Sequence, residues 1–200
     1  MSKIILASAS PRRRELLTQI GLKFEIKPSH KEERMQGTSP AQVVMGLAMD
    51  KAEDIFAQVG GIGKPDVLVI GADTIVALDN VILGKPKNED DALKMLRFLQ
   101  GRTHQVYTGV CLMTADKTQV FYEKTDVTMY PADEEQLINY IHTGEPMDKA
   151  GSYAIQGRGS VFVREIHGDY NNVVGLPVAE IWQRLMRDEI TRKIVIENKE

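Results

Sequence analysis

A cluster of arginines follows a helix start signal near the beginning of the chain. Ser10 suits the N-cap position and Pro11 the first helical position, so a helix is predicted to begin there. The arginines at 12–14 would then lie in its first turn, where the helix dipole disfavours each cation by roughly 0.3–1 kcal/mol. A bound anion would reverse that penalty, because backbone N–H groups and guanidinium groups would all point at it.

Two interpretations of this turn stay open, namely an anion site and three solvated arginines on an exposed turn. The apolar run 3–7 leads into the turn and predicts a strand buried on both faces. Ligands of open α/β sheets bind outside the carboxyl ends of the strands. That position favours the anion site.

A carboxylate and a lysine supply two further groups for phosphate chemistry. Asp73 comes just after the apolar strand predicted at 67–70, where an ionised carboxylate is costly unless it is paired or metal-bound. The alternative is a turn aspartate that caps Thr74 or a nearby amide. A hairpin predicted at 79–80 would bring Lys85 back toward Asp73. Such a pair can act as metal ligand or general base together with a charge neutraliser.

Lys51 and an acidic pair at 32–33 are weaker candidates. Lys51 falls within a helical stripe of apolar residues, and its spacing favours a lysine that snorkels to water over a cation turned toward a cleft. Glu32 and Glu33 follow the second predicted strand. Such a pair is usually solvated, but one of its carboxylates could complete a metal site.

The elements that must position these groups alternate between strands and helices in the first half and pair as hairpins in the middle. This order predicts an α/β or mixed α+β fold around one long sheet. The predicted strands are 3–7, 22–26, 67–70, 81–83, 104–114, 118–130 and 160–166. The predicted helices are 11–20, 40–59, 88–100, 133–143 and 177–188. Residues 1–190 are expected to form one domain, and residues 191–200 a polar, frayed tail.

Composition excludes several classes of protein. The 200 residues are 42% hydrophobic and 26% charged, as in an ordinary soluble domain, and the net charge of -3 argues against general nucleic-acid binding. Cys111 is the only cysteine and is expected to be a core residue. Neither a signal sequence nor a membrane span is predicted, so a cytoplasmic protein without a membrane partner is expected.

Five motifs together resemble the Maf family, in the family's order and over about residues 3–187. They are Ser8-Ala9-Ser10-Pro11-Arg12-Arg13, Gly71-Ala72-Asp73-Thr74, Gly84-Lys85-Pro86, Asp148-Lys149-Ala150-Gly151-Ser152-Tyr153-Ala154-Ile155-Gln156-Gly157 and Asn172-Val173-Val174-Gly175-Leu176-Pro177. The resemblance implies a nucleoside triphosphate pyrophosphatase that depends on a divalent cation (Mg, Mn or Co). It also implies the fold of inosine triphosphate pyrophosphatases, a long mixed sheet flanked by helices with a cleft between two lobes.

The resemblance also assigns roles to individual residues. Asp73 matches the family's proton acceptor, and the positions around the phosphates and metal are matched by Ser8, Arg13, Glu33, Lys51 and Lys85. Asp73 and Glu33 would hold the metal, while Asp73, Lys85 and Glu33 would form the catalytic set. The acidic loop departs from the family's usual Asp-Glu pair, since it contains Lys31-Glu32-Glu33, so Glu32 stays an alternative to Glu33.

Three positions imply the nucleotide that is preferred. Arg12, Thr74 and Gln156 match the subgroup that prefers dTTP and UTP, whereas the other bacterial subgroup tends to have Trp, Gln and Glu there and prefers a methylated GTP. A glutamine amide both donates and accepts, which suits the edge of uracil or thymine. The expected substrates are therefore pyrimidine nucleoside triphosphates.

Rival functions and the assembly stay open. One rival is a nucleotide-sensing regulator that affects septum formation or cell division, which would not need Asp73 and Lys85 together. A second is a nucleotidyl- or phosphotransferase, which would need an acceptor pocket that the sequence does not reveal. A homodimer is compatible with the sequence, which does not fix the oligomeric state.

Overall fold

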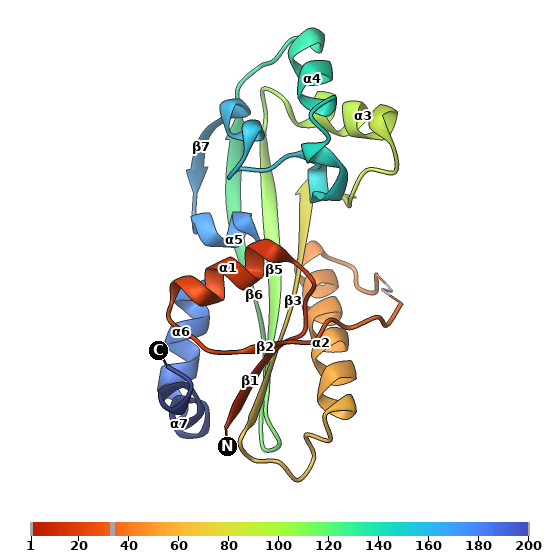
Figure 1. Cartoon of the computed structure of the whole chain (residues 1–200). Helices are drawn as coiled ribbons and strands as arrows, with labels where there is room; N and C mark the ends of the chain where they lie inside the picture. The colour runs from red at the N-terminus through yellow and green to blue at the C-terminus, as the bar shows by residue number, and fades with distance from the viewer. Residues whose placement is uncertain (1, 33–34, 200) are drawn as a thin grey trace. The chain divides into compact units, whose positions relative to one another are not determined.

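A computed structural model describes residues 2–32 and 35–199, which form two compact units (Figure 1). Among the described residues, unit 1 contains 2–32, 35–73, 108–123 and 175–199, and unit 2 contains 74–107 and 124–174. The predicted Glu33 lies outside the described residues.

The strands form one seven-stranded mixed sheet with the order β2-β1-β3-β5-β6-β7, and β4 pairs with β3. The strands are β1 (Lys3–Leu6), β2 (Glu25–Ile26), β3 (Val67–Leu78), β4 (Val81–Leu83), β5 (Thr103–Met113), β6 (Thr118–Met129) and β7 (Val163–His167). β1 is parallel to β2 and β3, whereas β4 and β7 are antiparallel to their neighbours β3 and β6. The sheet and its helices confirm the predicted mixed α/β class.

Strand β3 is longer than predicted. The expectation that it ends at Ile70, with Asp73 in a turn beyond it, is wrong, because β3 continues through Asp73 and Thr74 to Leu78. Its first residues pair with β1, in a register that sets Leu6 opposite Ile70, and its last residues pair with β4. Asp73 therefore lies within a strand, just past the end of its parallel neighbour β1.

Unit 1 contains α1 (Pro11–Gln19), α2 (Pro40–Gln58), α6 (Val178–Arg187) and α7 (Glu189–Glu197). The predicted start signal at Ser10 is confirmed, since its hydroxyl accepts a hydrogen bond from an N–H group in the first turn of α1, and Ser39 caps α2 in the same way. Figure 1 shows α2 on one side of the strands, with α6 and α7 on the other. A buried core joins α2 to alternate residues of β1, β3 and β5.

The backbone of helix α2 packs directly against the backbones of β3 and β5 at two glycines. A Cβ atom on Gly71 would lie 2.2 Å from the carbonyl oxygen of Ala48, and one on Gly109 would lie 2.2 Å from that of Val44. Both positions therefore require glycine.

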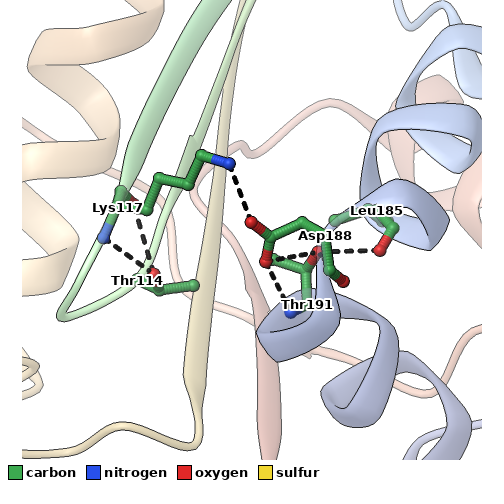
Figure 2. Close-up of polar contacts among 5 residues, drawn as sticks. All are labelled: Thr114, Lys117, Leu185, Asp188 and Thr191. Atoms are coloured by element: carbon green, nitrogen blue, oxygen red, sulfur yellow. Dashed lines mark hydrogen bonds and ion pairs between the residues drawn. The ribbon is translucent and has the colours of Figure 1, made fainter.

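The C-terminal residues form helix α7 and not the expected frayed tail. Ile194 and Val195 are buried, and the N–H of Lys23 donates to the carbonyl of Asn198. Asp188 caps the helix by accepting from the N–H of Thr191 (Figure 2). The sequence of the tail is polar overall, but Thr191, Ile194 and Val195 form one buried face of α7, and burial of that face orders it.

Figure 2 also shows how the β5–β6 turn contacts the same cap. The ammonium of Lys117 donates to the carboxylate of Asp188 at 2.8 Å. This contact, helped by the N–H of Thr191 and opposed by burial, holds the pKa of Asp188 below its ordinary value.

Unit 2 contains helices α3 (Glu89–Leu99), α4 (Glu134–Ile141) and α5 (Tyr170–Val174), with the 3₁₀ turns η1 (Glu145–Asp148), η2 (Ala150–Ser152) and η3 (Arg158–Phe162). The predicted helices at 88–100 and 133–143 are confirmed as α3 and α4, which Asn88 and Asp133 cap. The predicted hairpin is confirmed as well, with positive φ at Asp79 and Asn80.

Two expectations for unit 2 need correction. The strand predicted at 160–166 starts only at Val163, because η3 occupies the residues before it. Helix α5, which overlaps the start of the motif 172–177, was not predicted. It holds the buried Asn172, whose amide donates to Val106 and to Thr125.

One single-residue expectation concerns burial. Cys111 is fully buried, which confirms it as a core residue, and burial raises the pKa of its thiol to about 12. Within residues 2–32 and 35–199, no helix is long and apolar enough to cross a membrane.

The close approach of α2 predicts the effect of adding one methyl group. Gly109→Ala should lower the free energy of unfolding by about 3 kcal/mol, because the new Cβ meets backbone that cannot move aside cheaply. Gly46→Ala is the matched control on α2, where the nearest atom lies 3.9 Å away, and it should stabilise by roughly 0.5–1 kcal/mol. Denaturant unfolding measures both, and equal effects would contradict the packing.

Candidate functional site

The residues after β1 form a compact polar turn in unit 1. Ser8 is the second residue past Leu6, and its side chain is buried. The Ser8 hydroxyl accepts hydrogen bonds from the N–H of Ser10 at 3.3 Å and from Nη1 of Arg13 at 3.1 Å. The predicted anion-binding turn therefore has a fixed shape that depends on Arg13.

Arg13 is held by the protein itself. Only 9% of the residue is exposed, and its Nε donates to the carbonyl oxygen of Gly175 at 2.8 Å. The expectation that its charge lacks compensation unless an anion binds is therefore wrong. The sequence did not reveal this contact, because Gly175 lies 162 residues after Arg13, in the motif 172–177.

Lys51 and Asp73 form an ion pair. Nζ of Lys51 lies 2.5 Å from Oδ1 of Asp73, and the two side chains are only 15% and 13% exposed. Spacing alone favoured a lysine that snorkels to water, and that interpretation is wrong. The helical stripe indicated which face of α2 is buried, but it could not indicate that a carboxylate on β3 lies opposite.

The pair and the polar turn lie at the same edge of the sheet. Because Leu6 is opposite Ile70 in the parallel pair, Ser8 and Asp73 follow this matched position by two and three residues. Arg12, the guanidinium next to this turn, is partly exposed. Unit 1 thus gathers hydroxyl, guanidinium, ammonium and carboxylate groups where ligands of α/β sheets bind.

The remaining predicted residues belong to unit 2. Thr74 is the residue after Asp73 in β3 and is partly buried, while Lys85 is exposed in the loop that follows β4. Gln156 is exposed in the turn between η2 and η3. Their roles, and the convergence of Lys85 on Asp73, stay predictions.

Within unit 2, the segments of Lys85 and Gln156 are connected through the backbone. The N–H of Gly151 donates to the carbonyl of Gly84 at 3.0 Å. Gly151 has φ +70°, and a Cβ there would lie 2.9 Å from Val76. This position therefore needs glycine both for its conformation and for its packing.

A buried histidine behind the Gln156 segment was not singled out from the sequence. Nε2 of His104 hydrogen-bonds the hydroxyl of Tyr153 at 2.8 Å, and the rings pack edge to face. Burial lowers the pKa of His104 to about 4, so the ring is neutral at physiological pH. Tyr140 and Glu145, which hydrogen-bond each other, were not singled out from the sequence either. No motif or spacing in the sequence around them indicates a functional role.

The residues present fit a cation that is completed by substrate oxygens. Asp73 offers a hard carboxylate donor, but no group of three or more His, Cys, Asp or Glu side chains gathers among residues 2–32 and 35–199. Magnesium commonly binds through one or two carboxylates together with substrate phosphates. Binding of a divalent cation through Asp73 stays a prediction.

Residues 3–188 match the family model described as Maf-like protein. The chain belongs to the Maf family, which confirms the predicted resemblance.

Curated relatives match over almost their whole length. A protein from Agathobacter rectalis is 53% identical, with 94% of this chain and 98% of that protein covered, and it is named dTTP/UTP pyrophosphatase. A protein from Bacillus cereus strain G9842 has the same name and is 49% identical, with 95% and 97% covered.

One solved structure, that of the Staphylococcus aureus Ham1 protein, matches with a TM-score of 0.45 and 18% identity, over 64% of this chain and 72% of that chain. A likeness at this level does not show that the two chains share a fold. The predicted relation to inosine triphosphate pyrophosphatases therefore stays a prediction.

The contacts of Arg13 predict a structural cost for its removal. Arg13→Ala should destabilise the ligand-free protein by about 1.5–3 kcal/mol, because a charged donor to a buried carbonyl is lost. The exposed neighbour Arg14 is the matched control, since Arg14→Ala only relieves the helix dipole and should be neutral or slightly stabilising. Thermal unfolding without nucleotide decides, and an unchanged Tm for Arg13→Ala would contradict this role.

Proposed function

We propose that this protein hydrolyses dTTP and UTP to the nucleoside monophosphate and pyrophosphate. The observation that carries the proposal is the Lys51–Asp73 ion pair at the edge of the sheet that also holds Ser8 and Arg13. The names of the two curated relatives support the reaction and the pyrimidine preference.

Asp73 is the group that orients or deprotonates the attacking water. Its carboxylate is largely shielded from solvent, and Lys51 fixes one of its oxygens at 2.5 Å. A general base needs such fixed placement within hydrogen-bond reach of the water. Lys51 thus keeps Asp73 in place and adds positive charge near the triphosphate.

The two guanidinium groups near the turn in unit 1 have different roles. Arg13 shapes the turn by holding Ser8 and Gly175, while the more exposed Arg12 neutralises phosphate charge. Phosphoryl transfer depends mainly on positioning and on such charge stabilisation. Lys85 takes the role of neutralising the leaving pyrophosphate.

A divalent cation (Mg, Mn or Co) completes the proposal. Asp73 would hold it together with Glu33, for which Glu32 is the alternative. When bound, the ion would neutralise phosphate charge and polarise the phosphoryl oxygens.

The assembly and the cytoplasmic location stay predictions from the sequence.

Gln156, together with Thr74 and Arg12, selects the base of the nucleotide. The exposed amide of Gln156 can donate one hydrogen bond and accept another, which matches the N3–H and a carbonyl of uracil or thymine. A carboxylate at this position could only accept, and would suit guanine instead.

A nucleotide panel tests this function. The purified chain with Mg²⁺, Mn²⁺ or Co²⁺ should release UMP and pyrophosphate from UTP, and dTMP and pyrophosphate from dTTP, with higher kcat/KM than for GTP or ATP. Asp73→Asn, purified identically, controls for contaminating phosphatases and should lose about 10²–10⁴-fold in turnover.

Two outcomes would contradict the proposal. Release of a nucleoside diphosphate and orthophosphate would show cleavage between the β- and γ-phosphates and not between the α- and β-phosphates. Tight nucleotide binding without turnover would favour the nucleotide-sensing regulator.

A further inference from the structure

The carboxylate of Glu145 binds the backbone just past Gln156. Oε2 accepts from the N–H of Arg158 at 2.9 Å, and Oε1 accepts from the N–H of Gly159 at 3.0 Å. Oε1 also accepts from the hydroxyl of Tyr140 at 2.8 Å. One side chain therefore holds the C-terminal side of the turn.

Tyr140 holds the other side of the same turn. Its hydroxyl donates to Glu145 and accepts from the N–H of Ala154 at 3.1 Å. Its ring packs edge to face on Phe162, with the centroids 5.3 Å apart. Gln156 thus lies between two anchors, Ala154 before it and residues 158–159 after it.

Glycines let the turn lie directly on these two side chains. A Cβ on Gly157 would be 2.2 Å from Oε2 of Glu145, and one on Gly159 would be 2.6 Å from the hydroxyl of Tyr140. The backbone on either side of Gln156 is therefore fixed, while its own side chain is exposed.

The charge states make the direction of these bonds unambiguous. Burial alone would raise the pKa of Glu145, but the N–H groups of Gly159 and Arg158, with Tyr140 and Lys149, hold that pKa below its ordinary value. Burial, together with the bond to Glu145, raises the pKa of Tyr140. At neutral pH Glu145 only accepts and Tyr140 donates to it.

We propose that Glu145 and Tyr140 are positioning residues for nucleotide choice, which hold the turn of residues 154–159 so that Gln156 meets the base in one orientation. The proposal rests on the proposed function. Recognition through one amide requires its backbone to be held closely, since a displacement of about 1 Å can cost on the order of 100-fold. Neither residue needs to touch the substrate.

The first test measures discrimination. Glu145→Gln places an N–H₂ group against a backbone N–H, so it should lower the ratio of kcat/KM for UTP to that for GTP by roughly 10-fold. The change should appear mainly as a raised KM for UTP, because Asp73 and Lys51 are untouched. Tyr140→Phe keeps the ring and should lower the ratio less, which supplies a second variant if Glu145→Gln fails to fold.

A matched control separates positioning from general stability. Asp133 caps α4, the helix that carries Tyr140, and its carboxylate also accepts from a backbone N–H, at 2.8 Å. Asp133→Ala should lower Tm without changing the UTP to GTP ratio. A ratio within about twofold of wild type in both Glu145→Gln and Tyr140→Phe, with a lowered Tm, would overturn the proposal.

The second test asks whether the effect passes through Gln156. In a Gln156→Ala background, adding Glu145→Gln should lower the UTP to GTP ratio of kcat/KM no further, because the amide that Glu145 positions is absent. A further fall of roughly 10-fold would show that Glu145 acts by another route and would overturn the proposal.

Binding measurements keep this inference separate from the proposed function. Titration of wild type and Glu145→Gln with non-hydrolysable UTP and GTP analogues gives the ratio of Kd values without turnover. A pyrimidine preference in wild type that Glu145→Gln loses supports the positioning role even if no hydrolysis occurs. An equal Kd ratio in the two proteins contradicts it, whether or not UTP is hydrolysed.

Discussion

Backbone contact between α2 and the sheet is the constraint on which the candidate site depends. Gly71 and Gly109 have no side chains, so the carbonyls of Ala48 and Val44 approach β3 and β5 to a distance at which a Cβ could not fit. Lys51 lies one turn beyond Ala48 and reaches Asp73 on β3 at 2.5 Å. A larger residue at Gly71 would move the lysine away from its carboxylate.

The unequal lengths of two parallel strands explain why this edge of the sheet is polar. β1 ends at Leu6, whereas β3 continues past Ile70. The backbone after Leu6 passes through Ser8 into α1, which carries Arg13, at the level where β3 no longer pairs with β1. In unit 2 the Gln156 turn is held differently, by close-packed glycines, by the hydroxyl of the buried Tyr140 and by the carboxylate of the partly buried Glu145.

Signals that are local in the sequence predicted local structure well. The cap at Ser10 begins a helix as expected, because its side chain bonds an N–H only three residues away. Contacts between distant segments were missed. The partner of Lys51 lies 22 residues away and that of Arg13 lies 162 residues away, so neither periodicity nor composition could reveal them.

The most direct test of the account is a double-mutant cycle on Lys51 and Asp73. Steady-state release of pyrophosphate from UTP is measured for wild type, Lys51→Gln, Asp73→Asn and the double variant, all at the same metal concentration. If the ion pair works as one unit, the double variant should be about as slow as Asp73→Asn alone, because the lysine no longer has a carboxylate to hold. Losses that multiply would show that the two residues act independently and would contradict the account.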